Sequence, residues 1–264
     1  MDAEQRILEV FLAPIGGVVL GRDTRIVDRD GWYQTITPSS GSTQGNEVIY
    51  SRLDEATAEA AVRDTIRDYA AHGVPFRWCV GPPTEPASFG ALLERYGFTW
   101  QAGRGMAVDP ATWTQGPARW EIEIVTRANV AAYVVAFATG WEIELDVAAR
   151  CDDVVRALDT GRFHFVMARV DGVIAGTAGY VVKPSRAYLI GGNVLAPYRG
   201  RGVYRALIDH RLERILALGI PLAVTQAREA TSAPILEALG FETVYRSRMY
   251  LLSDPRAAVA ALAS

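Results

Sequence analysis

Apolar residues in the C-terminal half of the chain form three closely spaced runs with the character of buried strands. They cover residues 163–170, 173–183 and 187–195. Asp171 and Gly172 lie between the first two runs, and this pair is typical of a two-residue hairpin turn. The pattern therefore predicts an antiparallel meander of three consecutive strands.

A different period follows the meander. Apolar residues recur every three or four positions over residues 202–218, which predicts a helix that ends at Gly219. A short apolar strand is expected over residues 222–225. A second helix over residues 232–239 and a last strand over residues 241–252 complete the predicted order.

Turn-forming residues between positions 109 and 117 indicate a boundary between two halves. We expect an N-terminal domain over residues 1–115 and a C-terminal domain over residues 116–264. The second half opens with a predicted strand over residues 120–125 and a predicted helix over residues 129–139.

The N-terminal half shows a weaker but related pattern. It predicts a helix over residues 54–71, a strand over residues 76–80 and a helix over residues 88–96, while residues 37–42 read as a loop. Laying Gly97-Phe98 over Gly240-Phe241 also aligns leucine, glutamate and methionine residues on either side. We interpret this as an internal duplication, although helix-Gly-Phe-strand is also a common pattern by chance.

Composition and charge argue against several classes of function. The 264 residues are 50% hydrophobic and 22% charged, so the chain can bury a sizeable core. The net charge of -3 argues against a nucleic-acid partner, and no apolar run is long enough to predict a membrane span. Two cysteines and three scattered histidines predict no metal site. Since the sequence shows no leader pattern, we expect a cytoplasmic protein.

The segment most suggestive of chemistry is the glycine- and arginine-rich loop between the third meander strand and the following helix. Gly200 and Gly202 let the backbone approach a ligand, and the helix start offers free amide groups to a phosphate. Arg199, Arg201 and Arg205 add positive charge. A Walker loop would require a lysine that is missing here, and a Rossmann loop would follow an early parallel unit instead of a meander.

The run Arg199-Gly200-Arg201-Gly202-Val203-Tyr204 resembles the Arg/Gln-x-x-Gly-x-Gly/Ala signature of the GCN5-related N-acetyltransferase (GNAT) family. The order of elements over residues 120–252, with Gly240-Phe241 before the last strand, fits the same family. The resemblance implies an α+β fold of tandem GNAT-like domains, each a mostly antiparallel mixed sheet flanked by helices. The N-terminal domain would be a degenerate copy.

The resemblance also implies an acetyl-CoA site. The pyrophosphate of coenzyme A would sit on the amides of the loop, and the pantetheine arm would run beside the third meander strand. A backbone N–H near Val194 would polarise the thioester carbonyl. The residues implied are Asn193, Val194, Leu195, Arg199, Gly200, Arg201, Gly202, Val203 and Tyr204.

Three departures from the family pattern bear on catalysis. Tyr204 occupies the last glycine or alanine position of the signature. Leu236 stands where the family often has a proton-donating tyrosine, and Glu229 stands where an asparagine is frequent. Ser232 and Thr231 are the nearby candidates for the acid, although either could instead cap the helix that begins there.

Several acidic residues are candidates for the general base. Glu142, followed by Glu144 and Asp146, lies in the region that lines the acceptor site in such folds, although these residues also suit a solvated helix start. Glu229 is a further candidate for the base. The catalytic prediction therefore rests on Glu229, Ser232 and Glu142.

The function expected from these features is transfer of an acetyl group from acetyl-CoA to the amine of a small molecule, by direct attack in a ternary complex. The alternatives are another acyl-CoA donor, a hydroxyl acceptor, or a non-catalytic module that binds coenzyme A. We expect no metal, no nucleic-acid partner and no membrane partner, and a homodimer is possible. The N-terminal half has no counterpart of the arginine-glycine loop, because the prolines of Gly81-Pro82-Pro83 lack amide donors. Its expected task is to shape the acceptor pocket.

Overall fold

The computed structural model describes residues 2–117 and 119–262, and the chain divides by its contacts into two compact units. Unit 1 contains the described parts of Met1–Met106, Gln226–Leu239 and Thr243–Ser264. Unit 2 contains Ala107–Thr225, apart from residue 118, and Gly240–Glu242. The compact units thus divide the chain differently from a single cut after residue 115, and that domain boundary stays a prediction.

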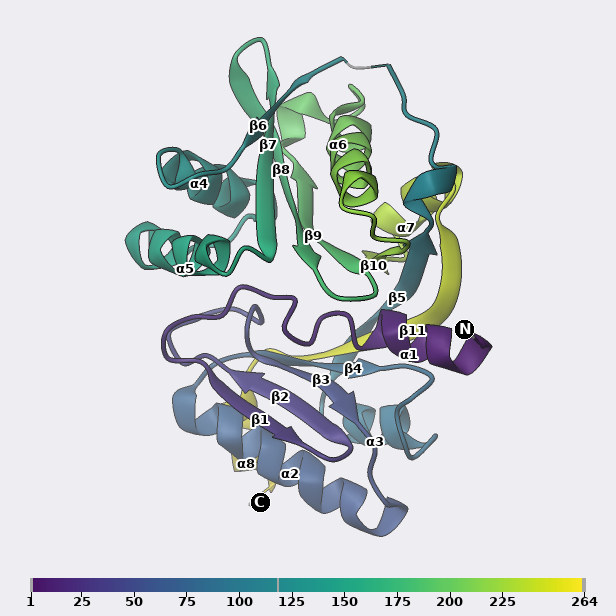
Figure 1. The fold of residues 1–264 in the computed structure, drawn as a ribbon. Coiled ribbons are helices and arrows are strands. Elements are labelled where there is room, and N and C mark those ends of the chain that lie inside the picture. Colours follow the sequence, from purple (N-terminus) through teal and green to yellow (C-terminus); the bar gives the residue numbers. More distant parts are fainter. Residues whose placement is uncertain (1, 118, 263–264) are drawn as a thin grey trace. The chain divides into compact units, whose positions relative to one another are not determined.

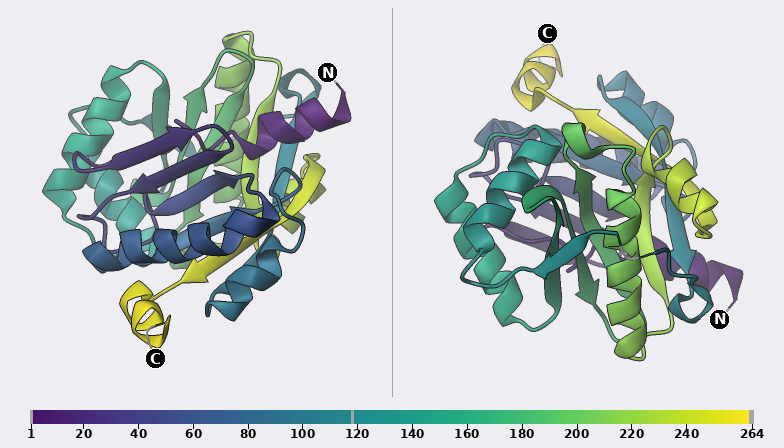
Figure 2. Two further views of the ribbon diagram at one scale, coloured as in Figure 1. Left: turned by 90° about the horizontal axis from the view of Figure 1, so that it is seen from below. Right: turned by 90° about the horizontal axis from the view of Figure 1, so that it is seen from above.

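Unit 2 is a sheet with helices on both faces. Its strands follow the order β10-β9-β8-β7-β6, and helices α4 and α5 lie on the opposite face of the sheet from α6 (Figures 1 and 2). Its elements are the short 3-10 turn η1 (Pro110–Thr112), β6 (Glu121–Ile124), α4 (Val130–Trp141), α5 (Val147–Asp159), β7 (Phe163–Val170), β8 (Val173–Val182), β9 (Ala187–Val194), the 3-10 turn η2 (Ala196–Tyr198), α6 (Val203–Ala217) and β10 (Ala223–Arg228), of which the first three residues belong to this unit.

The predicted meander is confirmed. Strands β7 and β8 pair antiparallel from Phe163↔Val181 to Val170↔Val173. Asp171 has φ 52° and Gly172 has φ 77°, which are the left-handed conformations that a tight hairpin turn of this kind requires. The prediction of the turn from this pair of residues was therefore correct.

Strand β9 carries an irregularity that matters for the site. Its pairing with β8 changes register between Thr177↔Asn193 and Gly179↔Ile190, and Gly191 within the shift has φ 61°. Such a bulge bends the strand and turns its backbone groups out of the ladder. On its other edge, β9 pairs with β10 in parallel only at Ala187↔Ala223 and Tyr188↔Val224, after which the register between them ends.

Unit 1 is likewise built around a run of paired strands. Its strands follow the order β1-β2-β3-β4-β11-β5, with the end of β10 beside β5. Its elements are α1 (Ala3–Phe11), β1 (Arg25–Arg29), β2 (Trp32–Ile36), β3 (Glu47–Ser51), α2 (Glu55–His72), β4 (Phe76–Val80), α3 (Phe89–Arg95), β5 (Thr99–Val108), α7 (Ser232–Ala238), β11 (Glu242–Leu252) and α8 (Pro255–Leu262). Strands β2 and β3 flank the loop expected at residues 37–42 and were not predicted as strands.

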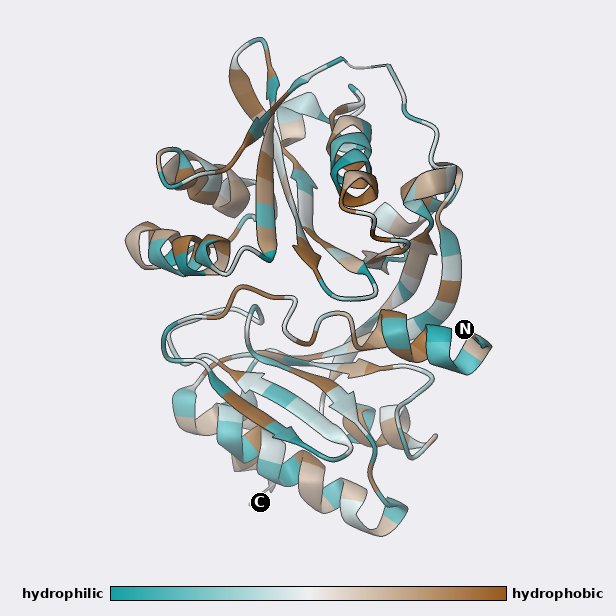
Figure 3. Ribbon diagram, viewed as in Figure 1, coloured by the Kyte–Doolittle hydropathy of each residue, from teal (hydrophilic) through white to brown (hydrophobic). Residues whose placement is uncertain are grey.

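The core of unit 1 lies between its sheet and helices α2 and α3. Trp78 is fully buried at its centre, and the rings of Trp32, Phe89 and Phe76 lie 5.3, 5.0 and 6.5 Å from it. Hydrophobic and hydrophilic residues alternate along α2, as expected for a helix with one buried face (Figure 3).

The two halves of the chain repeat one order of elements. The series β1-β2-β3-α2-β4-α3-β5 corresponds to β7-β8-β9-α6-β10-α7-β11. Gly97 and Gly240, which the sequence repeat aligns, follow α3 and α7 and have φ 82° and 100°. However, the last strand β11 pairs antiparallel with β4, from Phe76↔Leu252 to Val80↔Arg248, and lies between β4 and β5. The final strand of the C-terminal half therefore completes the sheet of the N-terminal half.

Candidate functional site

The glycine-rich loop after β9 has the backbone geometry of an anion site. Gly200 and Gly202 have φ 74° and 81°, a left-handed conformation that other residues adopt at a cost. The first helical bond of α6 runs from the amide of Ala206 to the carbonyl of Gly202, and Gly202 caps the helix without a side-chain bond. The amides at the start of α6 therefore have no acceptor within the helix and, together with the helix dipole, favour a phosphate.

The loop is held in place by an aromatic anchor. The indole Nε1 of Trp120 donates to the carbonyl oxygen of Arg201 at 2.9 Å. The guanidinium of Arg201 lies 5.4 Å from the ring centre of Trp120 and 5.6 Å from that of Tyr198. Arg201 also pairs with Asp171 at 3.7 Å. The sequence gives no sign of this role for Trp120, because 81 positions separate it from its partner.

The arginines of the loop differ in how far they are engaged. Arg205 donates to the Asp209 carboxylate at 3.0 Å and to the carbonyl of Thr114, so its charge is largely neutralised within the fold. Arg199 donates through Nε to the carbonyl of Val194 at 3.2 Å and makes no ion pair with any residue that the structure describes. Arg199 thus keeps its positive charge beside the loop.

The last residues of β9 lead into this loop. Asn193 is 8% exposed, and its amide Nδ2 donates to Thr177 Oγ1 at 2.9 Å, while its Oδ1 has no hydrogen-bond partner. The amide of Leu195 donates to the carbonyl of Ala175, which ends the strand. A buried acceptor without a donor has a free-energy cost, and this Oδ1 lies against Gly140 of α4.

The structure also shows where the unusual Tyr204 side chain goes. A Cβ atom added at Gly192 would lie 3.3 Å from the Tyr204 ring, so the ring packs against β9. Burial raises the pKa of the Tyr204 phenol. Tyr204 therefore contributes its side chain to the core beside β9, and its backbone amide remains at the helix start.

Among the three catalytic candidates, Glu229 lies in unit 1 within an ion-pair network. Arg104 binds its carboxylate through two nitrogens, and Arg246 approaches at 2.9 Å. The hydrogen bonds from Arg104, followed by those from Arg246, lower the pKa of Glu229 to about 2. Such a carboxylate is a weak base at neutral pH, so this environment favours a structural role. Its catalytic role stays a prediction.

Ser232 and Leu236 lie on α7. The Oγ of Ser232 accepts a hydrogen bond from the amide of Arg228 at 3.0 Å, which closes the turn before the helix. Thr231 is the N-cap residue of α7 and makes no capping bond with its side chain. Leu236 is 1% exposed and, as an apolar side chain, offers no proton.

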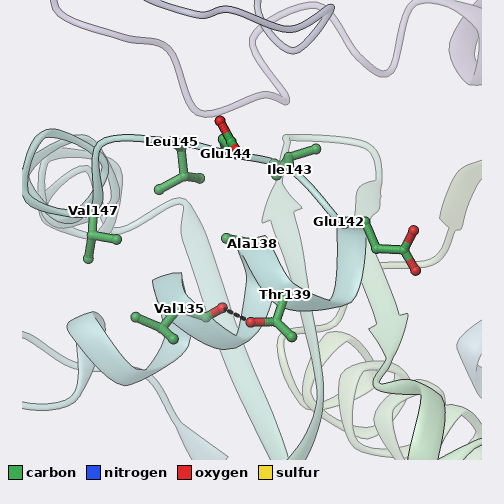
Figure 4. A pocket seen from close by; sticks show the side chains of 8 residues that line it. All are labelled: Val135, Ala138, Thr139, Glu142, Ile143, Glu144, Leu145 and Val147. Atoms are coloured by element: carbon green, nitrogen blue, oxygen red, sulfur yellow. Dashed lines mark hydrogen bonds between the residues drawn. The ribbon is translucent and has the colours of Figure 1, made fainter.

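Glu142 lies in unit 2 at the end of α4. It has φ 54° and lines an open hollow of about 400 Å³ between α4 and the start of α5. The apolar side chains of this hollow include Val135, Leu145 and Val147, and the Glu142 carboxylate points away from them (Figure 4). Asp146, considered with Glu142 as a base, accepts from the amide of Ala149 and caps α5.

In unit 1 the position that corresponds to the loop is closed by the chain itself. Strand β3 leads into α2 through residues 52–54, which include no glycine. The amide of Glu85 donates to the carbonyl of Ser51, and the amide of Leu53 donates to the carbonyl of Glu85. The segment after β4 thus binds to the end of β3. The corresponding end of β9 has no such partner, because β10 has already parted from it.

Residues 2–117 and 119–262 contain no group of three or more histidine, cysteine or acidic residues placed to hold a metal ion. No helix in these ranges is both long and apolar enough to cross a bilayer.

Residues 124–241 match the model of the acetyltransferase (GNAT) family. An acetyltransferase of Pectobacterium atrosepticum is 35% identical over 96 residues, which cover 35% of this chain and 67% of the relative. The chain belongs to the GNAT family. An uncharacterised N-acetyltransferase of Yersinia pestis is 36% identical over 95 residues, which cover 34% of this chain and 66% of the relative. The match thus spans about two thirds of the length of these relatives.

Solved structures extend the likeness to most of the chain. A GCN5-related N-acetyltransferase from Kribbella flavida superposes with a TM-score of 0.63 at 18% identity, over 93% of this chain and 94% of that one. A tandem GNAT protein from the clavulanic acid biosynthesis pathway gives 0.57 at 17% identity, over 88% and 84%. These likenesses show the fold, and they confirm the prediction of tandem GNAT-like domains with mixed sheets flanked by helices.

Proposed function

We propose that this GNAT protein transfers an acetyl group from acetyl-CoA to the amine of a small molecule. The observation that carries the proposal is the arrangement at the end of β9. There the strand parts from β10 after two residue pairs and leads into a loop whose free amides begin α6. This arrangement offers a slot for an extended arm beside the strand and an anion site at its end.

In this proposal the amides of residues 200–204 bind the pyrophosphate of coenzyme A, and Arg199 adds positive charge. The pantetheine arm runs along Asn193, Val194 and Leu195, beside the edge of β9 that has parted from β10. A backbone N–H near Val194 polarises the thioester carbonyl. The amine then attacks the carbonyl carbon directly, so no covalent enzyme intermediate is needed.

We assign the acceptor amine by its chemical class. The open hollow beside α4 combines apolar side chains with the exposed carboxylates of Glu142 and Glu144. This combination suits an amine on an apolar framework, because the cation is attracted by the carboxylates while the framework covers Val135 and Leu145. Glu142 stands at the edge of this hollow with its carboxylate pointing away from the apolar side chains, and we propose it as the base for an amine that extends past them.

The N-terminal unit has no part in cofactor binding under this proposal. Its corresponding strand edge is occupied by the backbone of Glu85, and its helix α2 begins with Asp54 and Glu55. Two carboxylates at a helix start repel a pyrophosphate. We therefore expect one acetyl-CoA for each chain.

Calorimetric titration with acetyl-CoA tests the proposal. We expect micromolar binding at a single site, and we expect Arg199→Glu to weaken it by about tenfold or more, because one charge reversal beside a phosphate is worth 1–2 kcal/mol. Arg127→Glu is the matched control, since Arg127 is an exposed arginine in the turn before α4 and pairs with Asp159.

The outcomes separate the candidate functions. Equal affinity in wild type and Arg199→Glu would refute the cofactor site. Binding without turnover over a broad panel of amines would favour a non-catalytic module, which the apolar Leu236 makes a specific alternative. Turnover with a longer acyl-CoA or with an alcohol would replace the proposed donor or acceptor.

A further inference from the structure

Helix α6 carries a buried arginine on the face that packs against the sheet of unit 2. Arg211 is 2% exposed. Its Nε donates to the carbonyl oxygen of Leu207 at 2.9 Å, and its Nη1 donates to the carbonyl oxygen of Gly179 on β8 at 3.1 Å. No carboxylate of the described residues forms an ion pair with it.

An uncompensated buried cation is costly, because desolvation of a charge is normally offset by an opposite charge. Burial lowers the pKa of Arg211 to about 10, so the guanidinium remains charged at neutral pH. The titratable groups around it do not neutralise it either. They are Tyr204 and His210 on α6, Tyr133 on α4 and, beyond Tyr133, Arg150 on α5.

The guanidinium lies against the part of β9 that leads to the proposed site. A Cβ atom added at Gly192 would lie 3.6 Å from Arg211 Nη2 and 3.9 Å from Nη1. Gly192 belongs to the bulge of β9 and directly precedes Asn193, whose Oδ1 has no partner. The positive charge is therefore next to the strand segment along which the thioester end of the donor is proposed to bind.

We propose that Arg211 is a positioning residue whose fixed charge stabilises the thiolate of coenzyme A as it leaves. This inference rests on the proposed function. As the amine nitrogen bonds to the carbonyl carbon, the carbon–sulfur bond breaks and its electron pair passes to sulfur. The proton of the amine passes to the proposed base, Glu142. The charge of Arg211 then takes the place of the proton donor that Leu236 cannot supply, since a preorganised charge in a dry site lowers the free energy of an anion.

The pKa of the thiol of bound coenzyme A measures the effect of the Arg211 charge, and no acceptor is needed for this measurement. Its ionisation is followed by thiolate absorbance over a pH titration, as the difference between protein with coenzyme A and protein alone. We expect the wild type to lower the pKa of the bound thiol below that of free coenzyme A. We expect Arg211→Met to remove about one unit of that shift, which is a tenfold loss of thiolate at pH values well below the pKa.

Two further variants make the comparison specific. Arg211→Lys keeps the charge and should keep most of the shift. Arg214→Met removes an exposed arginine less than one turn later on the same helix and should leave the shift as in the wild type. If the role of Arg211 were only structural, Arg211→Met would be less stable than the wild type but would show the same pKa for the bound thiol.

The outcomes distinguish this inference from the proposed function. Failure of the wild type to bind coenzyme A would refute the proposed function. Binding with an unshifted thiol in the wild type would overturn the role of Arg211 alone, and this measurement decides the matter even where Arg211→Met does not fold. An equal shift in the wild type and Arg211→Met would overturn it as well.

Discussion

Replacing Gly202 by alanine tests whether the left-handed conformation of the loop holds its amides in place. A Cβ atom at Gly202 would meet nothing within 4 Å, so the substitution adds no clash and leaves only the strain of φ 81°. For an alanine this strain amounts to about 1–2 kcal/mol. Since Gly202 is exposed, the loop can relax to a different conformation and then lose its alignment with a phosphate.

We expect Gly202→Ala to bind acetyl-CoA about 5–30-fold more weakly, which is the factor that corresponds to 1–2 kcal/mol. Calorimetric titration measures the affinity, and thermal unfolding measures the stability. If the loop keeps its conformation and retains the strain, the affinity is unchanged and Tm falls by about 2–4 °C for each kcal/mol of strain. Gly161→Ala is the matched control. Gly161 has φ 68° and open space around it, and it lies in the turn between α5 and β7.

Gly161→Ala should lower Tm by a similar amount without changing the affinity for acetyl-CoA. Unchanged affinity together with unchanged Tm in Gly202→Ala would refute the reasoning, because the strain would then be absent. Equal losses of affinity in both variants would show that the effect is global and has no connection with the loop.

Three further changes give separate tests of the structure. Trp120→Phe removes the N–H that binds the carbonyl of Arg201, and titration should show acetyl-CoA binding weakened by about fivefold, the effect of one hydrogen bond of about 1 kcal/mol. Arg104→Met should raise the pKa of Glu229 toward its ordinary 4.5 and lower Tm. Because the pKa of Glu229 is depressed in the folded state, the ionised Glu229 stabilises the wild-type fold above pH 4.5, and this stabilisation is lost toward pH 2. The difference in Tm between wild type and Arg104→Met should therefore shrink as pH falls through that window. Lys183 is the one lysine of the chain, and burial lowers its pKa to about 8, which a single methylated-lysine resonance should report by NMR titration.

Each of these tests has a defined contrary result. Trp120→Phe with wild-type affinity would show that the ring alone anchors the loop. Arg246 is far more exposed than Arg104, so Arg246→Met should lower Tm less, and the reverse order would contradict the network as described. A Lys183 pKa above 10 would contradict its burial.

The local pattern of the sequence was sufficient for the elements around the site. The three meander strands, the turn at Asp171 and the helix after Gly202 are present within a few residues of their expected bounds. Each of these depends on short-range chemistry, namely alternation, a turn that needs positive φ, and a helix start after glycine. The arginine-glycine loop followed from the same kind of signal.

Other features depend on partners that are distant in sequence. Strand β11 was predicted as a strand, but its pairing with β4 rather than beside β10 follows from long-range competition between sheet edges. Strands β2 and β3 were missed because buried polar residues, such as Gln34 and Glu47, interrupt their apolar pattern. Nor does the sequence indicate that Arg211 is buried without a carboxylate, since helical spacing gives a residue's face and not its partners.

The exchange of strand β11 has a consequence for the order in which this chain acquires its structure. Unit 1 combines the described part of Met1–Met106 with Gln226–Leu239 and the described residues from Thr243 onward, which follow unit 2 in the chain. During synthesis the edge of β4 that pairs with β11 therefore stays unpaired until residues 248–252 have left the ribosome. Unit 2 lies mostly within an uninterrupted segment and can close first. A nascent chain of this kind should depend on chaperones that shield an open strand edge.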